Sequence, residues 1–178
     1  MRVISGKYKG KKIEGFDIDG TRPTMDRVKE SVFGSIQNYI KNSTCLDLFA
    51  GSGSLGIEAL SNGADSCHFV DNGHIAFKTL EQNLKWVDEK KYTYKMGYEE
   101  ALQTFYKKGI SFDIIFLDPP YAFNLITDAL KKIEEYNLLK EDGIIVCEYE
   151  KEKIITNFTC IKDKKYGSTY ISIYKHNG

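Results

Sequence analysis

The sequence has little of what a metal site, a disulfide scaffold or a membrane protein needs. Among its 178 residues are three histidines and four cysteines, and the cysteines stand singly with no CxxC pair. Neither residue type shows the spacing of zinc ligands, so we expect no metal site. No apolar run reaches the length of a membrane span, and the N-terminus lacks the hydrophobic region of a signal peptide. We therefore expect a cytoplasmic protein with reduced cysteines and no membrane association.

The chain also lacks an excess of either charge. Its 25 Lys and Arg residues balance 25 Asp and Glu residues, which argues against a protein that coats nucleic acid by bulk attraction. The charge is unevenly placed, because residues 1–12 contain five basic side chains and no acid. A lysine-rich edge strand protected against aggregation explains this pattern, and from charge alone we favour that explanation. The alternative is a set of phosphate-binding residues: Lys7, Lys9, Lys11 and Lys12.

Weak alternation around two glycines predicts a basic β-hairpin at the N-terminus, with RVISG and KKIEG as its arms. We place this hairpin extension over residues 1–20 and the main domain over residues 21–178. The main domain opens with a predicted helix over 24–40, for which Thr24 is the expected N-cap.

From residue 45 onward, strand-like and helix-like segments alternate. Each of the first four predicted strands is followed by a helical pattern, which is the order of right-handed βαβ crossovers in a parallel sheet. The last residues predict two strands joined by a tight turn. The expected fold is α/β, a Rossmann-like, mostly parallel, doubly wound sheet that an antiparallel C-terminal hairpin closes. The five predicted parallel strands cover residues 45–50, 66–71, 92–97, 112–118 and 143–149.

A glycine-rich loop follows the first of these strands. Gly51, Gly53 and Gly56 form a GxGxxG pattern, and Asp71 follows Gly51 by twenty residues at the end of the next strand. That spacing is typical of a nucleotide site in which the acid binds ribose hydroxyls. A tight turn without a ligand is the alternative for the glycines alone, and the terminal acid makes it the weaker one.

Asp47 decides which nucleotide the loop suits. It lies four residues before Gly51, where a carboxylate would repel the diphosphate of a dinucleotide. S-adenosylmethionine carries a sulfonium and an ammonium group and no phosphate. Two unit charges a few ångströms apart interact by about 4 kcal/mol at an effective dielectric of about 20, so we favour S-adenosylmethionine. A carboxylate held by loop amides is compatible with the same role.

The stretch FDIIFLDPPY ends a predicted buried strand in an acid, two prolines and a tyrosine. Pro119 restricts Asp118 to an extended conformation, and neither proline has a backbone N–H. Their carbonyls and the carboxylate form a corner that only accepts hydrogen bonds, beside the ring of Tyr121. Such a corner suits the exocyclic amine of a nucleobase that stacks on the tyrosine. A stiff turn at a strand end would not explain the aspartate and the tyrosine together.

Three stretches of the chain, in this order and spacing, resemble the RsmD family of bacterial enzymes. They are RPTMDRVKESVF (22–33), LDLFAGSGSLGIEAL (46–60) and FLDPPY (116–121). The resemblance covers essentially the whole chain and implies an S-adenosylmethionine-dependent methyltransferase fold. It also implies methylation of the N2 amine of one guanine in 16S ribosomal RNA, free or in an assembled small-subunit particle. We expect the protein to act as a monomer.

The resemblance implies roles for individual residues. Asp71 would bind the ribose, and the other members of the cofactor loop would surround the ligand. The implied cofactor-binding residues are Asp47, Phe49, Gly51, Gly53, Gly56 and Asp71. The implied catalytic residues are Asp118, Pro119 and Tyr121.

The RPTxDR segment and two departures from the family concern the substrate and the adenine. Arg22 and Arg27 match this segment, and we expect them to grip phosphate, which suits the planar guanidinium group. Tyr98 stands near where related enzymes often carry a small or acidic residue. Glu99 then becomes the candidate for adenine recognition. Gly34 stands where the family pattern leads us to expect an asparagine.

Three other functions stay open on the sequence. The DPPY motif does not determine which base is methylated, so one alternative is a methyltransferase acting on adenine N6 in DNA. No separate target-recognition domain is visible, which argues against it. A dinucleotide-dependent oxidoreductase would explain the glycine loop and Asp71 but would leave Asp47 and DPPY without a role. A non-catalytic RNA-binding module is the third, and the intact DPPY motif speaks against it.

Overall fold

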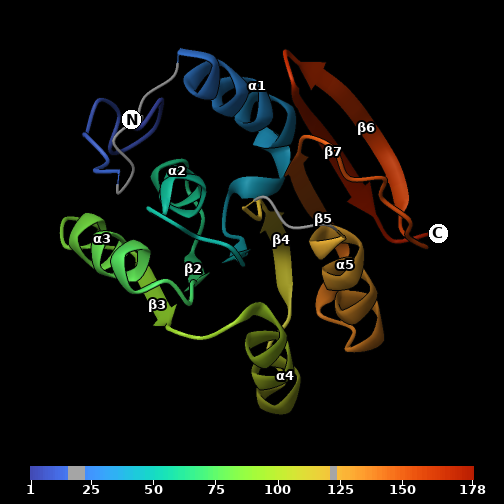
Figure 1. Cartoon of the computed structure of the whole chain (residues 1–178). Helices are drawn as coiled ribbons and strands as arrows, with labels where there is room; N and C mark the ends of the chain where they lie inside the picture. Colours follow the sequence, from blue (N-terminus) through green and yellow to red (C-terminus); the bar gives the residue numbers. More distant parts are fainter. Residues whose placement is uncertain (16–22, 121–123) are drawn as a thin grey trace.

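The computed structural model of the chain describes residues 1–15, 23–120 and 124–178. A seven-stranded sheet runs through it, with the strand order β3-β2-β1-β4-β5-β7-β6 (Figure 1). The helices are α1 (Pro23–Ile40), α2 (Ser54–Ser61), α3 (His74–Leu84), α4 (Tyr98–Lys108) and α5 (Leu125–Glu135). The strands are β1 (Thr44–Asp47), β2 (Ser66–Val70), β3 (Lys90–Tyr94), β4 (Phe112–Leu117), β5 (Leu139–Tyr149), β6 (Thr159–Tyr166) and β7 (Thr169–Lys175).

The first five strands form the parallel part of the sheet. β1 pairs with β2 and β4, β2 also pairs with β3, and β4 pairs with β5, all in parallel. β7 runs antiparallel between β5 and β6. This arrangement confirms the predicted α/β class, the doubly wound sheet and the antiparallel C-terminal hairpin. Because the strand order reverses between β1 and β4, their carboxyl ends border the crevice where such sheets bind ligands.

Helices cover both faces of the sheet (Figure 1). α1, α2 and α3 pack with the N-terminal residues on one face, around strand residues such as Cys45 and Phe116. α4 and α5 pack on the other face, around strand residues such as Leu46 and Leu117. Adjacent residues of a strand point to opposite faces, so the position of a polar residue in its strand determines which helices it meets.

Most predicted elements are present, with some ends displaced. α1 begins at Pro23, so Thr24 lies within the helix and is not the N-cap that we expected. Proline is favoured at the first helical position because its missing N–H would have no helical partner there. β1 stops at Asp47 instead of residue 50 because the chain turns there into the glycine loop. β5 begins at Leu139 instead of residue 143.

The N-terminal arm, residues 1–13, forms a turn fitted to α2, and the predicted two-stranded hairpin is reduced to a single β-bridge between Arg2 and Lys12. Val3, Tyr8 and Ile13 are buried in the core that α1, α2 and α3 share. At Gly6, where φ is +85°, a Cβ would lie 2.0 Å from the Ser61 carbonyl oxygen. The proposed division between residues 20 and 21 lies outside the described residues, so the two-part organisation stays a proposal.

Candidate active site

Three carboxylates lie on one face of the sheet near the carboxyl ends of neighbouring strands. Asp47 ends β1, Asp118 directly follows β4, and Glu148 is near the end of β5. Each stands two positions after a strand residue that packs in the core formed with α1, α2 and α3. Since the side chains of a strand alternate with a period of two, all three point toward that side of the sheet. The carboxylates therefore form a row across β1, β4 and β5.

Asp47 is the most enclosed of the three, with 1% of its surface exposed. Its Oδ2 accepts a hydrogen bond from the Gly56 amide at 3.1 Å, which ties the end of β1 to α2. Its Oδ1 has no partner within the described parts of the chain. Burial raises the pKa of this carboxyl to about 7, and the nearby Asp71 carboxylate adds to the rise. A buried acceptor without a donor suits a ligand that brings N–H groups or positive charge.

Asp71 holds the glycine loop in place. Its Oδ2 accepts a hydrogen bond from the Gly51 amide and its Oδ1 accepts one from the Gly73 amide, both at 2.8 Å. Gly51 has a φ of +55°, a left-handed conformation that glycine adopts without strain. Each carboxylate oxygen keeps a second lone pair after accepting one amide. Asp71 can thus anchor the loop and still accept hydrogen bonds from a ligand.

Gly56 and Gly53 are required by packing. A Cβ at Gly56 would lie 2.3 Å from the Phe69 ring, so a side chain there would push α2 away from β2. A Cβ at Gly53 would lie 2.6 Å from the Leu80 side chain, and its φ of +88° also favours glycine. The GxGxxG pattern therefore brings the start of α2 close to the sheet, beside Asp47.

Phe49 and Glu99 occupy different environments next to the loop. Phe49 is half-buried and its ring centroid lies 5.4 Å from that of Tyr98. The Tyr98 hydroxyl donates a hydrogen bond to Asp128 of α5, so this tyrosine joins the loop to the face that α4 and α5 cover. Glu99 is exposed in the first turn of α4. Its contact with adenine stays a prediction.

Asp118 and Glu148 are neighbours across β4 and β5. Leu117 pairs with Cys147, and these two acids are the next residue of each strand. Both side chains are partly buried, and the strand register brings their carboxyl groups close enough to interact. Burial raises the pKa of Asp118 well above its usual value and the Glu148 charge raises it further, while burial also raises the pKa of Glu148. The sequence analysis missed Glu148 because only the strand register places it beside Asp118.

The structure places two of the three predicted catalytic residues. Asp118 and Pro119 lie at the predicted edge of the sheet, and Tyr121 lies outside the described residues. Where the description resumes, the start of α5 is fixed by Glu152. Its two carboxylate oxygens accept hydrogen bonds from the first amides of that helix, Ile126 N at 3.1 Å and Thr127 N at 2.7 Å. The segment after β5 therefore anchors the start of α5.

The four lysines of the N-terminal arm differ in their surroundings. Lys7 and Lys12 form ion pairs with acidic residues of the same chain at 2.9 and 3.5 Å. Lys11 lies over the Trp86 ring, and Lys9 is exposed. Ion pairs at a protein surface contribute little free energy, so phosphate can compete for these side chains. The phosphate-binding role stays a prediction, with Lys9 and Lys11 its strongest members.

The sequence analysis overlooked lysines on the C-terminal hairpin. Lys164 lies over the Tyr166 ring and Lys165 over the Tyr170 ring, at 5.3 and 5.4 Å from the centroids. Tyr170 pairs with Tyr149 at the carboxyl end of β5, which puts the β6–β7 turn at the same end of the sheet as the carboxylates. The run KDKK was the available signal, but it is equally typical of a protected edge strand.

Of the two arginines expected to grip phosphate, one is visible. Arg27 is exposed on α1, and Arg22 lies outside the described residues. α1 also contacts the C-terminal hairpin, through a hydrogen bond between Ser31 and Tyr166. Arg27 therefore belongs to the helix that borders the hairpin lysines, and its phosphate contact stays a prediction.

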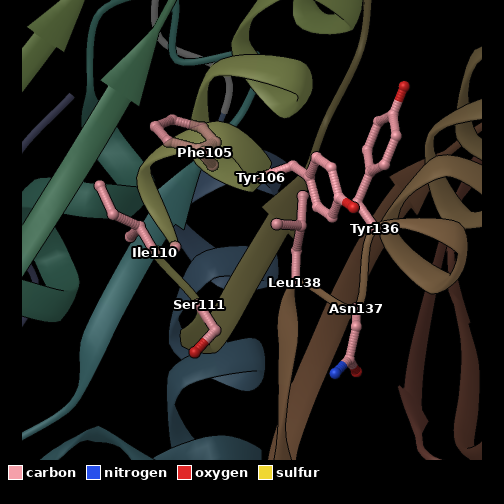
Figure 2. A pocket seen from close by; sticks show the side chains of 8 residues that line it. Phe105, Tyr106, Ile110, Ser111, Tyr136, Asn137 and Leu138 are labelled. Atoms are coloured by element: carbon pink, nitrogen blue, oxygen red, sulfur yellow. The ribbon is translucent and has the colours of Figure 1, made fainter.

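A hollow of about 290 Å³ lies at the opposite end of the sheet, where α4 and α5 end and β4 begins (Figure 2). Tyr106 and Tyr136 stack there with ring centroids 5.1 Å apart. Its described lining contains no acid, lysine or arginine. It is therefore separate from the row of carboxylates and has no group that would bind a charged cofactor.

Within residues 1–15, 23–120 and 124–178, no three His, Cys, Asp or Glu side chains are grouped as metal ligands would be. No helix in the described chain is long and apolar enough to cross a membrane. The expected absence of a metal and of membrane association stays a prediction.

Comparison with known proteins gives matches along the whole chain. Residues 1–175 match the family model described as Conserved hypothetical protein 95. Ribosomal RNA small subunit methyltransferase D from Haemophilus influenzae is 38% identical over 182 residues, covering 99% of this chain and 94% of the relative. The protein of the same name from Escherichia coli K12 is 30% identical over 179 residues, covering 98% and 89%.

A solved structure also agrees with the fold over nearly its full length. The protein yhhF from Escherichia coli has a TM-score of 0.87 at 29% identity, covering 99% of this chain and 97% of that one. Because the family model and the relatives above both span almost the entire sequence, the chain belongs to the RsmD family.

Proposed function

We propose that this protein transfers a methyl group from S-adenosylmethionine to the exocyclic N2 amine of a guanine in 16S ribosomal RNA. The observation that carries the proposal is the row of Asp47, Asp118 and Glu148, together with the unpartnered Oδ1 of Asp47. In the described parts of the chain, no lysine or arginine pairs with these carboxylates. Such a site suits a cationic cofactor and a reaction in which positive charge develops. The names of the relatives, small-subunit ribosomal RNA methyltransferases, support the same activity.

The residues around the glycine loop fit S-adenosylmethionine. When bound, this cofactor supplies an electrophilic methyl group on a sulfonium. Asp47 would meet its positive charge and N–H donors, and Asp71 would accept from the ribose hydroxyls through its remaining lone pairs. Phe49 would contact the ligand at the loop, and Glu99 the adenine. A dinucleotide fits less well, because its diphosphate would face a carboxylate whose Oδ1 needs a donor.

Asp118 positions the target amine in this proposal. The lone pair of such an amine is delocalised into the base, so the nitrogen is a poor nucleophile. A hydrogen bond to Asp118 favours the pyramidal geometry in which the lone pair is available, and Pro119 keeps the acid extended. Tyr121 stacks on the base. The base has to leave its stack to reach this corner, as other enzymes that modify bases require.

Basic side chains on several elements contact the RNA backbone. They are Lys7, Lys9, Lys11 and Lys12 of the N-terminal arm, Arg22 and Arg27, and Lys164 and Lys165 of the hairpin. The net charge of the whole chain is zero, so selectivity depends on the shape of folded RNA or of an assembled small-subunit particle. We propose that the protein acts there as a monomer in the cytoplasm.

Transfer of labelled methyl groups tests the function. The protein is incubated with labelled S-adenosylmethionine and 16S RNA, either free or in small-subunit particles that lack the modification. We expect label in N2-methylguanine at one position. Label in N6-methyladenine would support the alternative amino-methyltransferase, and no label in the RNA would exclude the proposed activity.

A further inference from the structure

Glu148 lies beside Asp118 and has no role in the sequence analysis. The two side chains occupy neighbouring positions on parallel strands and point to the same face of the sheet. We propose that Glu148 is a second acid of the reaction centre, which holds one proton jointly with Asp118 so that the pair takes up the proton released by the methylated amine. The inference rests on the proposed amino-methyltransferase function and adds a residue to it.

Any hydrogen bond between the two carboxyl groups requires a proton. An ionised carboxylate only accepts hydrogen bonds, so two carboxyl groups can share one only when one of them is protonated. In the described chain, Asp118 is the acid that lies beside the Glu148 side chain. Glu152 differs, because both of its oxygens accept amides of α5. Glu152 thus fixes the start of α5, whereas Glu148 is left to interact with Asp118.

The charges around the pair favour retention of this proton. Asp47 faces it from β1, and Glu150 lies beyond it in the same chain segment. On the β7 side, the residue opposite Glu148 is the uncharged Ile171. Among the described residues, no positively charged side chain is a cause of the pKa shift of either acid. Two acids in such a setting titrate as a unit, and the loss of their last shared proton is pushed to higher pH.

The acid pair can then take up the proton that the reaction releases. The amine nitrogen uses its lone pair to form the bond to the methyl carbon, while the carbon–sulfur bond breaks and its electrons stay on sulfur. The nitrogen is now positively charged and gives one proton to Asp118, whose own shared proton moves onto Glu148. The pair goes from one proton to two, and it returns the extra proton to water after the product leaves.

Carbon-13 NMR titration of the carboxyl groups, in the full chain without RNA, tests the pair itself. We expect one Asp and one Glu signal to titrate together, with one step well above the usual range. Glu148→Gln and Asp118→Asn should each leave a single, uncoupled step for the remaining acid, while the Asp47 transition near pH 7 is retained in both. Glu150→Gln is the matched control, because it removes a neighbouring charge and keeps the hydrogen bond. Two coupled steps that survive in Glu148→Gln, or that are lost in Glu150→Gln, overturn the pair.

Single-turnover methyl transfer at several pH values tests what the pair does. Glu148→Gln leaves Asp118 without the shared proton, so the rate should fall about tenfold, and the high-pH limb that marks loss of that proton should disappear. Binding of S-adenosylhomocysteine should be unchanged, and Glu148→Asp should recover part of the rate. An unaltered pH profile in Glu148→Gln overturns the role in proton uptake.

A variant that does not fold and a wild type without activity would each still give a clear answer. If a melting curve shows that Glu148→Gln does not fold, the Asp118→Asn titration and the Glu148→Asp profile decide the question by the same criteria. If the wild type transfers no methyl group to RNA but shows the coupled titration, the pair stands and the proposed function fails.

Discussion

The two halves of the candidate site are held together in different ways. Around β1 and β2, Asp47 and Asp71 bind backbone amides of the adjoining glycine loop. At the ends of β4 and β5, Asp118 meets Glu148 because two strands are in register. The half around the glycine loop, which is the proposed cofactor half, is thus formed by a short stretch of chain. The catalytic half depends on the assembly of the whole sheet.

The halves also differ in how well their acids are satisfied. Asp71 accepts two amides, one on each oxygen. Asp47 accepts one amide, and its other oxygen has no partner within the described residues. An acid with few donors in a buried position retains a proton that a well-bonded one would lose. We therefore expect Asp47 and Asp118 to respond to pH and to positively charged ligands, and Asp71 to behave as part of the scaffold.

The largest expected effect concerns the stability of the cofactor-free protein. Burial raises the pKa of Asp47 from 3.8 to about 7, so the folded protein holds a proton that the unfolded chain loses at lower pH. This group should therefore lower the free energy of unfolding as pH rises from about 4 to about 7, by up to about 4 kcal/mol. Urea denaturation across this range should show the slope in wild type and a smaller slope in Asp71→Asn, because the Asp71 charge adds to the raised pKa of Asp47. If Asp47→Asn keeps the whole slope, Asp47 is not the cause.

Replacing Asp118, the proposed catalytic acid, comes next. Asp118→Ala should lower single-turnover methyl transfer by about 100-fold, because it removes a group that acts on developing charge, while cofactor affinity stays nearly intact. Asp118→Asn should be milder, since its amide oxygen still accepts a hydrogen bond. Equal losses in the two variants would mean that the charge of the carboxylate matters more than acceptance. Near-native turnover in Asp118→Ala would remove Asp118 from the mechanism.

Removing Asp71 from the cofactor half should lower cofactor affinity instead of the rate of methyl transfer. Asp71→Ala removes the acceptor of two loop amides and of the proposed ribose contact, so cofactor affinity should fall by about 1.5–3 kcal/mol. Calorimetry with S-adenosylhomocysteine measures the loss. Asp71→Asn retains one acceptor oxygen and should be intermediate. Unchanged binding in Asp71→Ala would separate the loop anchor from the ligand.

The smallest effect is expected at the RNA surfaces. Neutralising Lys9 and Lys11 together, or Lys164 and Lys165 together, should weaken RNA binding modestly. The slope of log affinity against log salt concentration should become shallower by about one to two. Cofactor affinity should not change. Lys41→Gln, an exposed lysine at the end of α1, is the control. A salt dependence that matches this control would assign the tested pair to the solvated surface.

The two halves of the site also differ in how much of each could be predicted from the sequence. The α/β class, the mostly parallel sheet and the place of Asp47, Asp71 and Asp118 follow from spacing, because parallel strands bring their carboxyl ends to one edge. Glu148 could not be found this way, since CEY looks like any strand end. Its role depends on which residue of β4 lies beside it.

The N-terminal segment shows a second limit. Charge and alternation predicted a hairpin, but Gly6 packs against the Ser61 carbonyl, and Tyr8 is buried in the core. These are contacts with residues more than fifty positions away in the sequence, and no local pattern encodes them. The same contacts explain why the arm forms a turn against α2 and makes little β-structure of its own.

The central claim is that a positively charged cofactor replaces the proton of Asp47. Calorimetry of S-adenosylmethionine near pH 6.5, in buffers that differ in ionisation enthalpy, measures the protons released on binding. We expect a large fraction of one proton to leave in wild type and none in Asp47→Asn, with no comparable binding of NAD. Tighter binding of NAD, or equal proton release in wild type and Asp47→Asn, would contradict the account.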